Sequence, residues 1–128
     1  MKSDSWRRFR FGLTALSAAF LVACAAEQGS EGVTDDAIRV GMIADLTGPL
    51  AFLGQEISAG AELYIQHVNE QGGVHGRQIE LIVEDDGYQP PRTVAAFRKL
   101  VDVDGVFFLA GNIGTATTMA IMPMLEDE

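Results

Sequence analysis

The sequence predicts an α/β fold, in which a parallel sheet carries helices on its faces. Three short apolar segments typical of strands alternate with three segments of helical character, and short links of Gly, Pro and Asp separate them. Because parallel strands joined through helices need right-handed crossovers, this order favours a single sheet covered by helices. We expect the strands in the spatial order 2-1-3.

The first strand and the first helix are expected within residues 38–71. Residues 38–44 are mostly apolar, and the loop over residues 45–54 contains Gly-Pro. In the helix expected over residues 54–71, one face carries apolar side chains, at Ile57, Ala61, Tyr64, Ile65 and Val68. Gly72 and Gly73 then end the helix.

The second strand is expected over residues 78–84, followed by a loop over residues 85–89. Two prolines at 90 and 91 begin a helix that continues to about residue 102, because proline is favoured in the first helical turn. The side chains expected to face the sheet are Val94, Phe97, Leu100 and Val101.

The third strand is expected over residues 106–110, which are wholly apolar, as in a strand that is buried on both faces. Gly111, Asn112 and Gly114 then allow a tight turn. The third helix is expected over residues 115–126. Pro123 should kink this helix, because it cannot donate a hydrogen bond to the carbonyl of Met119.

The loop after the third strand is the candidate binding site. Thr115, Thr117 and Thr118 open the following helix, where free N–H groups and the helix dipole favour a carboxylate or another small anion. In a 2-1-3 sheet the winding reverses between strands one and three, so a ligand is expected between loops 45–54 and 111–118. The alternative is that Thr115 is only an N-cap and Gly111 only a turn residue.

The first 36 residues are expected to be a lipoprotein signal peptide and a tether. Residues 1–23 have a basic start and an apolar core too short to span a bilayer, as in a secretory signal. The sequence Leu-Val-Ala-Cys ending at Cys24 resembles the bacterial lipobox, which implies acylation of this cysteine; the alternative is an ordinary signal cut near Ala23. Residues 24–36 are small and polar and predict a flexible tether.

Composition excludes several partners. The chain has 128 residues, enough for one domain at most, and from Cys24 onward it has 5 Lys and Arg against 17 Asp and Glu. This acidic charge argues against nucleic acid or anionic lipid as a partner. The single cysteine excludes an intrachain disulfide and a cysteine-based zinc site.

Acidic residues at the strand ends offer an alternative function. Asp45, Asp85 and Asp86 follow strands one and two, where carboxylates could hold Mg²⁺ in a metal-dependent phosphoryl-transfer enzyme. The third strand ends in Ala-Gly-Asn, with no acid to receive a phosphoryl group. No dinucleotide motif follows the first strand, and no Gly-x-Ser-x-Gly is present. We therefore expect Asp85 and Asp86 to cap turns, and we expect no metal and no cofactor.

Several motifs together resemble one family. They run in order along the chain: Ile38-Arg39-Val40-Gly41, Leu46-Thr47-Gly48-Pro49-Leu50-Ala51, Gly54, Gly60-Ala61, Asn69, Gly72-Gly73-Val74, Gly76-Arg77, Glu84-Asp85-Asp86 and Pro91. The series is similar to the start of a solute-binding receptor of an ABC importer, of the leucine/isoleucine/valine-binding type with the type I periplasmic binding fold.

The resemblance implies a non-enzymatic receptor whose two α/β lobes close over a solute. Residues 37–128 would then form half of the first lobe, so the sequence is expected to be a truncated or partial one. The implied solute is an amino acid or an analogue, and the implied partner is an ABC permease in a bacterial membrane. The receptor would be anchored through its lipid on the periplasmic or extracellular face. A sensory domain of the same fold is the other possibility.

The resemblance also implies a set of ligand-binding residues. The family places a Ser or Thr hydroxyl on the ligand carboxylate where Thr115 stands, and backbone atoms near Ile113 and Gly114 line the same pocket. It often places an aromatic or bulky wall where Leu53 stands, and Phe52 precedes that position.

Overall fold

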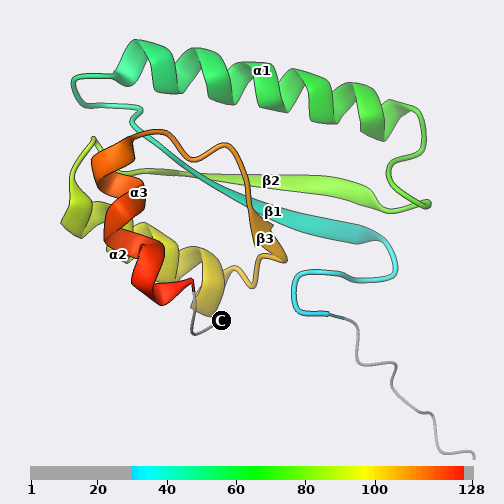
Figure 1. The fold of residues 1–128 in the computed structure, drawn as a ribbon. Coiled ribbons are helices and arrows are strands. Elements are labelled where there is room, and N and C mark those ends of the chain that lie inside the picture. Colours follow the sequence, from blue (N-terminus) through cyan, green and yellow to red (C-terminus); the bar gives the residue numbers. More distant parts are fainter. Residues whose placement is uncertain (1–29, 126–128) are drawn as a thin grey trace, which may run out of the picture.

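The computed structural model describes residues 30–125. The expected signal peptide, Cys24 and the last residue of the third predicted helix lie outside this range. In order, the elements are β1 (Ala37–Ala44), α1 (Ala51–Glu70), β2 (Gln78–Asp85), α2 (Pro90–Arg98), a π-helical turn (Lys99–Val103), β3 (Phe108–Leu109), α3 (Thr115–Ile121) and a 3₁₀ turn (Met122–Met124) (Figure 1).

The sheet has the predicted topology. Its order is β2-β1-β3, and both pairings are parallel. β1 pairs with β2 along its whole length, from Ala37 opposite Gln78 to Ala44 opposite Asp85. β3 pairs with the middle of β1, where Val40 lies opposite Phe108. The carboxyl ends of the strands therefore lie at one edge of the sheet.

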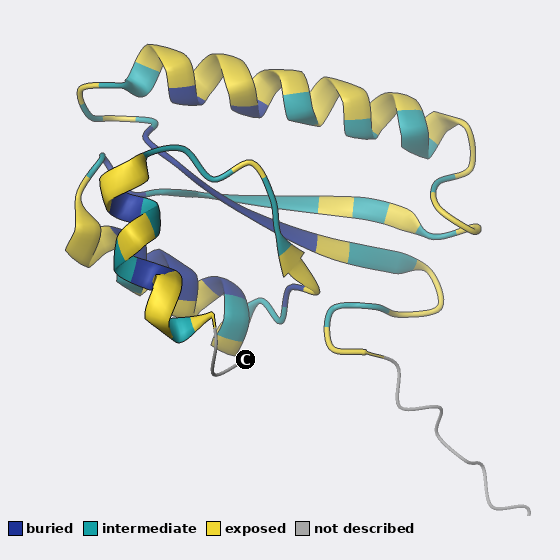
Figure 2. Cartoon of the chain, viewed as in Figure 1, coloured by how far each residue is buried: buried dark blue, intermediate teal, exposed yellow. Residues whose placement is uncertain are grey.

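The helices form two layers around this sheet. α1 lies along one face, and α2 and α3 lie together against the other (Figure 1). The hydrophobic core fills the space between the sheet and the α2–α3 layer, where buried side chains gather in Figure 2. Its buried members are Ile43, Ala96, Phe97, Leu100, Val106 and Ile121, with Val94 and Val101 packed against them. All four side chains predicted to face the sheet from the second helix contact this core.

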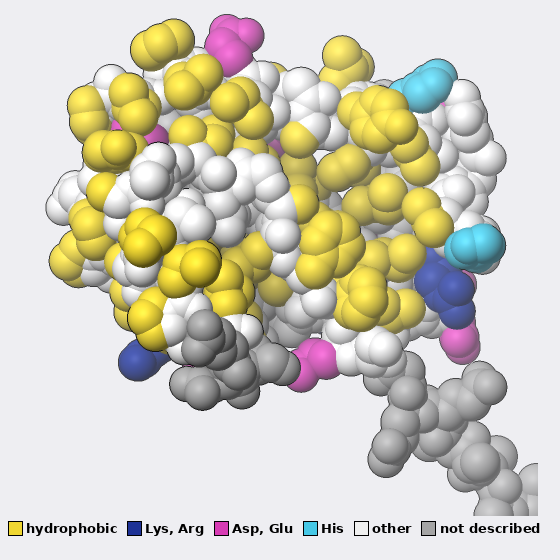
Figure 3. Space-filling view, in the orientation of Figure 1, with side chains coloured by type: hydrophobic (Ala, Val, Ile, Leu, Met, Phe, Trp, Pro, Cys, Tyr) yellow, Lys and Arg dark blue, Asp and Glu magenta, His cyan; other side chains and the backbone are white. Residues whose placement is uncertain are grey.

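The first helix faces the sheet with only part of the predicted apolar face: Ala61, Ile65 and Val68 are partly buried, and the other two residues are not. Ile57 and Tyr64, expected to face inward, are 41% and 70% exposed, and hydrophobic side chains gather over α1 in Figure 3. Gly54 and Ser58 are buried instead. A methyl group at Gly54 would lie 1.9 Å from the carbonyl oxygen of Asp45. The helix approaches the end of β1 too closely for a large side chain, and this contact sets its rotation.

Asn69 holds the C-terminal end of α1 to β2. Its side-chain amide donates to the carbonyl of Ile79 at 2.9 Å, and its Oδ1 accepts from the N–H of the same residue at 2.8 Å. As predicted, two glycines end the helix, with positive φ angles of 99° at Gly72 and 71° at Gly73. α1 is therefore fixed to β1 at its start and to β2 at its end.

The third strand is shorter and more exposed than predicted. Only Phe108–Leu109 pair as β3, whereas the sequence predicted a strand over residues 106–110 buried on both faces. Val106 is buried, but Phe107 and Phe108 are each about half exposed. β3 is the edge of the sheet, and no described residue pairs with its outer side. Because successive side chains of a strand point to opposite faces, the apolar run is partly exposed on both faces at this edge.

The C-terminal helix also differs from its prediction. The α-helix ends at Ile121, and Pro123 lies in the 3₁₀ turn that follows. Proline has no N–H to donate, so the last turn tightens instead of continuing as a kinked α-helix.

Residues 30–36, expected to belong to a flexible tether, are bonded to the sheet. The N–H of Arg39 donates to the carbonyl of Gly32, and the N–H of Gln78 donates to that of Asp36. The guanidinium of Arg77 donates to the carbonyl of Thr34 at 2.7 Å. The ordered domain therefore includes this turn. Within residues 30–125, no helix combines the length and the hydropathy needed to cross a membrane.

Two glycines in α1 provide a matched test of its packing. We expect Gly54→Ala to lower the free energy of unfolding by about 1–3 kcal/mol, because the added methyl collides with the Asp45 carbonyl. Gly60→Ala should raise it by up to about 1 kcal/mol, because nothing lies within 4 Å of the new methyl and alanine favours helix. Urea unfolding followed by circular dichroism measures both; equal effects would show that the close contact is absent.

Candidate functional site

Three loops meet at the carboxyl edge of the sheet, beyond Ala44, Asp85 and Leu109 (Figure 1). The loop after β3 is bonded to Ile43, near the end of β1. The loop after β1 packs closely against the loop after β2. A methyl group added at Gly48 would lie only 2.5 Å from the carbonyl oxygen of Gly87. Of the two loops that were predicted to border a ligand, the loop after β3 is thus bonded to the end of β1, and the loop after β1 packs against the loop after β2.

Asp45 shapes the loop after β1. The residue is fully buried, and its Oδ1 and Oδ2 accept the N–H groups of Gly48 at 2.5 Å and Leu50 at 2.7 Å. These two bonds close the loop directly before α1. Both carboxylate oxygens are therefore directed at the backbone of their own loop.

Asp85 joins the loops after β1 and β2. Its Oδ1 accepts the N–H groups of Leu46 at 2.9 Å and Gly87 at 3.0 Å. Its Oδ2 accepts the Thr47 hydroxyl at 2.6 Å and forms an ion pair with Arg92 of α2 at 2.8 Å. A single carboxylate thus receives four donors from three segments of the chain.

Asp86 holds the start of α2. It is fully buried, its Oδ1 accepts the N–H of Tyr88 at 2.8 Å, and its Oδ2 accepts the Thr93 hydroxyl at 2.8 Å. Asp85 and Asp86 bond to turn N–H groups as predicted, and the oxygens of Asp45 also accept hydrogen bonds from the protein. Among residues 30–125, no three His, Cys, Asp or Glu side chains gather as metal ligands would.

Asn112 extends the pairing of β1 beyond β3. Its Oδ1 accepts the N–H of Ile43 at 3.0 Å, and the N–H of the next residue, Ile113, donates to the Ile43 carbonyl at 3.1 Å. The loop therefore runs beside β1 as a strand would. The N–H of Ile113, in the set implied by the family resemblance, is engaged with β1 in this structure.

The start of α3 leaves Thr115 free of the capping role. Gly114 is the N-cap, with φ of 113°, and no side chain caps the helix. The Thr117 hydroxyl is buried and donates to the carbonyls of Ile113 and Gly114, at 3.3 and 3.0 Å. Within the described part of the chain, the N–H groups of Thr115 and Ala116 have no protein acceptor.

A shallow cavity of about 310 Å³ lies beside this helix start. It is lined by Asn112, Gly114, Thr115, Thr118 and Met119. Two of the predicted site residues, Gly114 and Thr115, thus lie together in it. Leu53 and Phe52 do not line it; they lie in the first turn of α1, 38% and 72% exposed.

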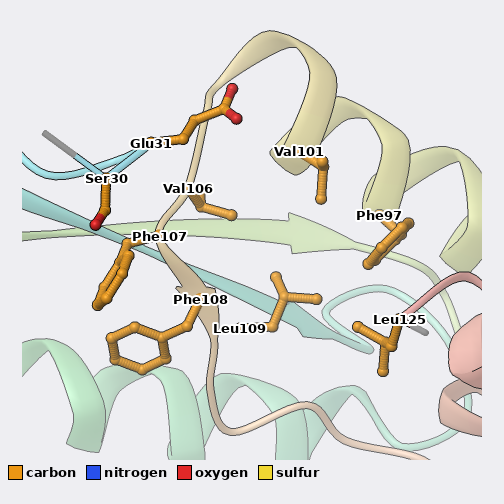
Figure 4. A pocket seen from close by; sticks show the side chains of 9 residues that line it. All are labelled: Ser30, Glu31, Phe97, Val101, Val106, Phe107, Phe108, Leu109 and Leu125. Atoms are coloured by element: carbon orange, nitrogen blue, oxygen red, sulfur yellow. The ribbon is translucent and has the colours of Figure 1, made fainter. Parts of the chain in front are cut away.

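A second cavity, of about 320 Å³, lies behind β3 and contains none of the predicted site residues (Figure 4). Phe97, Val101, Leu109 and Leu125 surround it, whereas the rings of Phe107 and Phe108 stand to one side in an edge-to-face pair. Its lining is mainly apolar and comes from α2 and the turn after it, from β3 and the residues before it, and from both ends of the described chain. It offers few groups that could recognise a charged solute.

Two contributors to the loop edge were missed from the sequence. Asn112 was read only as a turn residue, although an asparagine directly after a buried strand can extend the strand pairing through its side chain. For Tyr88 the sequence left open a ring that closes over the neighbouring loop or, as favoured, a surface position; the ring lies against Gly114. A tyrosine directly after glycine in a short loop was the only signal for this contact.

The hydrogen bonds that Asp85 accepts lower the pKa of its carboxyl group. Burial raises the pKa of this carboxyl, but the bonds from its four donors lower it more, so that the pKa falls from 3.8 to about 2. Because the folded state holds the ionised form more tightly than the unfolded state does, this residue stabilises the fold above about pH 4. That contribution is lost as the pH falls toward 2.

Comparisons with known proteins agree with this fold. A protein family described as periplasmic binding protein matches residues 37–128. The leucine-, isoleucine-, valine-, threonine- and alanine-binding protein of Pseudomonas aeruginosa is 34% identical over 117 residues, which are 91% of this chain and 31% of that protein. The chain therefore spans about a third of the length of this relative.

Two solved structures resemble the fold. The fatty acid ABC transporter substrate-binding protein from Thermomonospora curvata matches with a TM-score of 0.71 and 35% identity, over 78% of this chain and 25% of that one. The branched-chain amino acid transporter substrate binding protein from Streptococcus pneumoniae, in complex with isoleucine, matches with a TM-score of 0.68 and 25% identity. That match covers 72% of this chain and 26% of the other.

Replacing Asp85 tests the link between the loops. We expect Asp85→Asn to lower the free energy of unfolding by about 2 kcal/mol near neutral pH, since a pKa difference of this size corresponds to that energy. The variant should also lose most of the difference in stability between about pH 4 and about pH 2. Urea titrations across this range, with the exposed Glu62→Gln as control, measure both effects. Parallel pH profiles for wild type and Asp85→Asn would contradict this role.

Proposed function

Because the chain belongs to the periplasmic binding protein family, we propose that it forms part of an extracytoplasmic receptor that binds a small carboxylate-bearing solute for an ABC importer. The solute is an amino acid with an aliphatic side chain or a close analogue. The receptor transfers it to the membrane permease and does not change it chemically. The family match and the loop geometry support this function independently of each other.

The observation that carries the proposal is the position of Thr115. It lies in a cavity at the carboxyl edge of the sheet, beside N–H groups that lack a protein acceptor. In parallel α/β sheets, ligands bind at this edge where the winding direction reverses. With order β2-β1-β3, that point lies between the loops after β1 and β3.

The solutes named for the relatives share one chemical group. The Pseudomonas protein is named for leucine, isoleucine, valine, threonine and alanine, the Streptococcus structure contains isoleucine, and the Thermomonospora protein is named for fatty acids. All of these carry a carboxylate. The first turn of α3, with its N–H groups and the Thr115 hydroxyl, suits this group in this chain as well.

The hydrogen bonds of the three aspartates at this edge fit a non-enzymatic role. Asp45, Asp85 and Asp86 each bind donors of the protein itself, so their oxygens serve the loops. Closure of a second lobe over the solute would provide the change of shape that a permease detects. Acylation at Cys24 would keep the receptor at the outer face of a bacterial membrane.

Substitution of Thr115 tests the carboxylate site. In the product of the complete gene, we expect Thr115→Ala to weaken binding of L-isoleucine by about 1–3 kcal/mol, because a hydrogen bond to a charged group is lost. Thr115→Ser keeps the hydroxyl and should bind nearly as tightly as wild type. Isothermal titration calorimetry measures all three proteins. Unchanged affinity in Thr115→Ala would remove this side chain from the site.

The lipid anchor has a separate test. In a bacterial host fed radiolabelled palmitate, we expect the wild-type protein to incorporate label and to sediment with membranes. Cys24→Ala removes the thiol that would be acylated, so this variant should carry no label and remain in the soluble fraction. Equal labelling of both proteins would show that the lipid is attached elsewhere, and no labelling of either would exclude the anchor.

A further inference from the structure

We propose that Tyr88 is a positioning residue for the solute site: its ring supports Gly114 and thereby holds the start of α3 in the shape that binding needs. The expected effect on solute binding rests on the proposed function, whereas the contact between Tyr88 and Gly114 does not. Tyr88 lies in the loop after β2, whereas Gly114 lies in the loop after β3. The ring therefore connects loops from opposite sides of β1.

The backbone delivers the ring to this place at a conformational cost. Gly87 and Tyr88 have positive φ angles of 55° and 59°, and this region is unfavourable for a bulky residue such as tyrosine. The buried carboxylate of Asp86 holds the turn, because it accepts the N–H of Tyr88 at 2.8 Å. An unfavourable conformation persists where surrounding contacts favour it, and the partly buried ring supplies such contacts.

The ring and the glycine fit each other closely. A methyl group at Gly114 would lie 2.9 Å from Cε2 of Tyr88 and 3.2 Å from its Cδ2. It would also lie 2.3 Å from the Thr117 hydroxyl oxygen. The backbone at Gly114 adopts a φ of 113°, which favours glycine. The absence of a side chain at this position thus makes room for the ring.

The contact between Tyr88 and Gly114 would affect the N–H groups that are proposed to bind the solute carboxylate. Gly114 is the N-cap of α3, so its backbone angles set the direction of the peptide groups that follow. Tyr88 does not line the cavity that contains Gly114 and Thr115. It would act on the solute through the glycine, by limiting the positions that the loop can adopt. A site whose groups are held in place loses less freedom on binding.

The contact is tested first without any solute. In the NMR spectrum of the 128-residue chain, the ring current of Tyr88 should displace the α-proton resonances of Gly114 from their usual positions. Tyr88→Phe keeps the ring and should keep this displacement, whereas Tyr88→Leu should abolish it. Tyr64→Leu is the matched control, since Tyr64 is 70% exposed on α1 and should leave the resonances of Gly114 unchanged.

A double-mutant cycle tests the steric fit. Gly114→Ala should destabilise the chain less in the Tyr88→Leu background than in the wild type, because the collision with the ring is gone. Additive effects in the cycle, or Gly114 resonances that Tyr88→Leu does not move, would overturn the proposal. The resonance test needs only Tyr88→Leu, so it decides the matter even if the glycine variant does not fold.

The consequence for binding is tested in the product of the complete gene with L-isoleucine. Tyr88→Leu should weaken binding by about tenfold, as expected when a site becomes less preorganised, and Tyr88→Phe should restore it. Equal affinity of the leucine variant and the wild type would overturn the positioning role even if the ring contact is real. Failure of the wild type to bind L-isoleucine would instead contradict the proposed choice of solute, and the resonance test would still decide whether Tyr88 supports Gly114.

Discussion

The carboxylate of Asp85 is the interaction on which the loop edge depends. It accepts two backbone N–H groups, one hydroxyl and one guanidinium, from the loops after β1 and β2 and from α2. Charged hydrogen bonds of this kind are stronger than neutral ones. They join two loops that the sheet alone would leave separate, and the same loop after β2 carries Tyr88 to the loop after β3. The geometry of the candidate site therefore depends on an acid that does not line the cavity beside α3.

Much of the fold follows from periodicity and from turn residues. The order of strands and helices, the parallel sheet and the inward face of α2 were all predictable, because long apolar patterns report burial directly. The rotation of α1 was predictable only in part, since Ala61, Ile65 and Val68 are partly buried as expected, whereas Tyr64 is exposed. Close packing there depends on the absence of a side chain at Gly54, and a hydrophobic pattern does not reveal where a side chain must be absent. The apolar run at β3 likewise indicated two buried faces, but burial depends on neighbours that a local pattern cannot supply.

The position of the candidate site in the fold could be predicted better than the residues that form it. Strand order and loop chemistry located it at the ends of β1 and β3, and Gly114 and Thr115 do lie together there. The contribution of Asn112 depends on a hydrogen bond to Ile43, 69 residues away in the sequence, and spacing along the chain does not reveal such a partner. The wall expected from Leu53 and Phe52 does not reach the same cavity in residues 30–125, so the site as described is open on that side.

We propose that the loop after β3 and the start of α3 hold the solute carboxylate, while the aspartates at the same edge hold the loops. A crystal structure of the complete gene product with bound L-isoleucine tests this arrangement. We expect the solute carboxylate within hydrogen-bonding distance of the Thr115 hydroxyl and the first N–H groups of α3, with Asp85 still bonded to Leu46 and Gly87. A solute bound elsewhere, or an Asp85 carboxylate turned toward the solute or toward a metal ion, would contradict it.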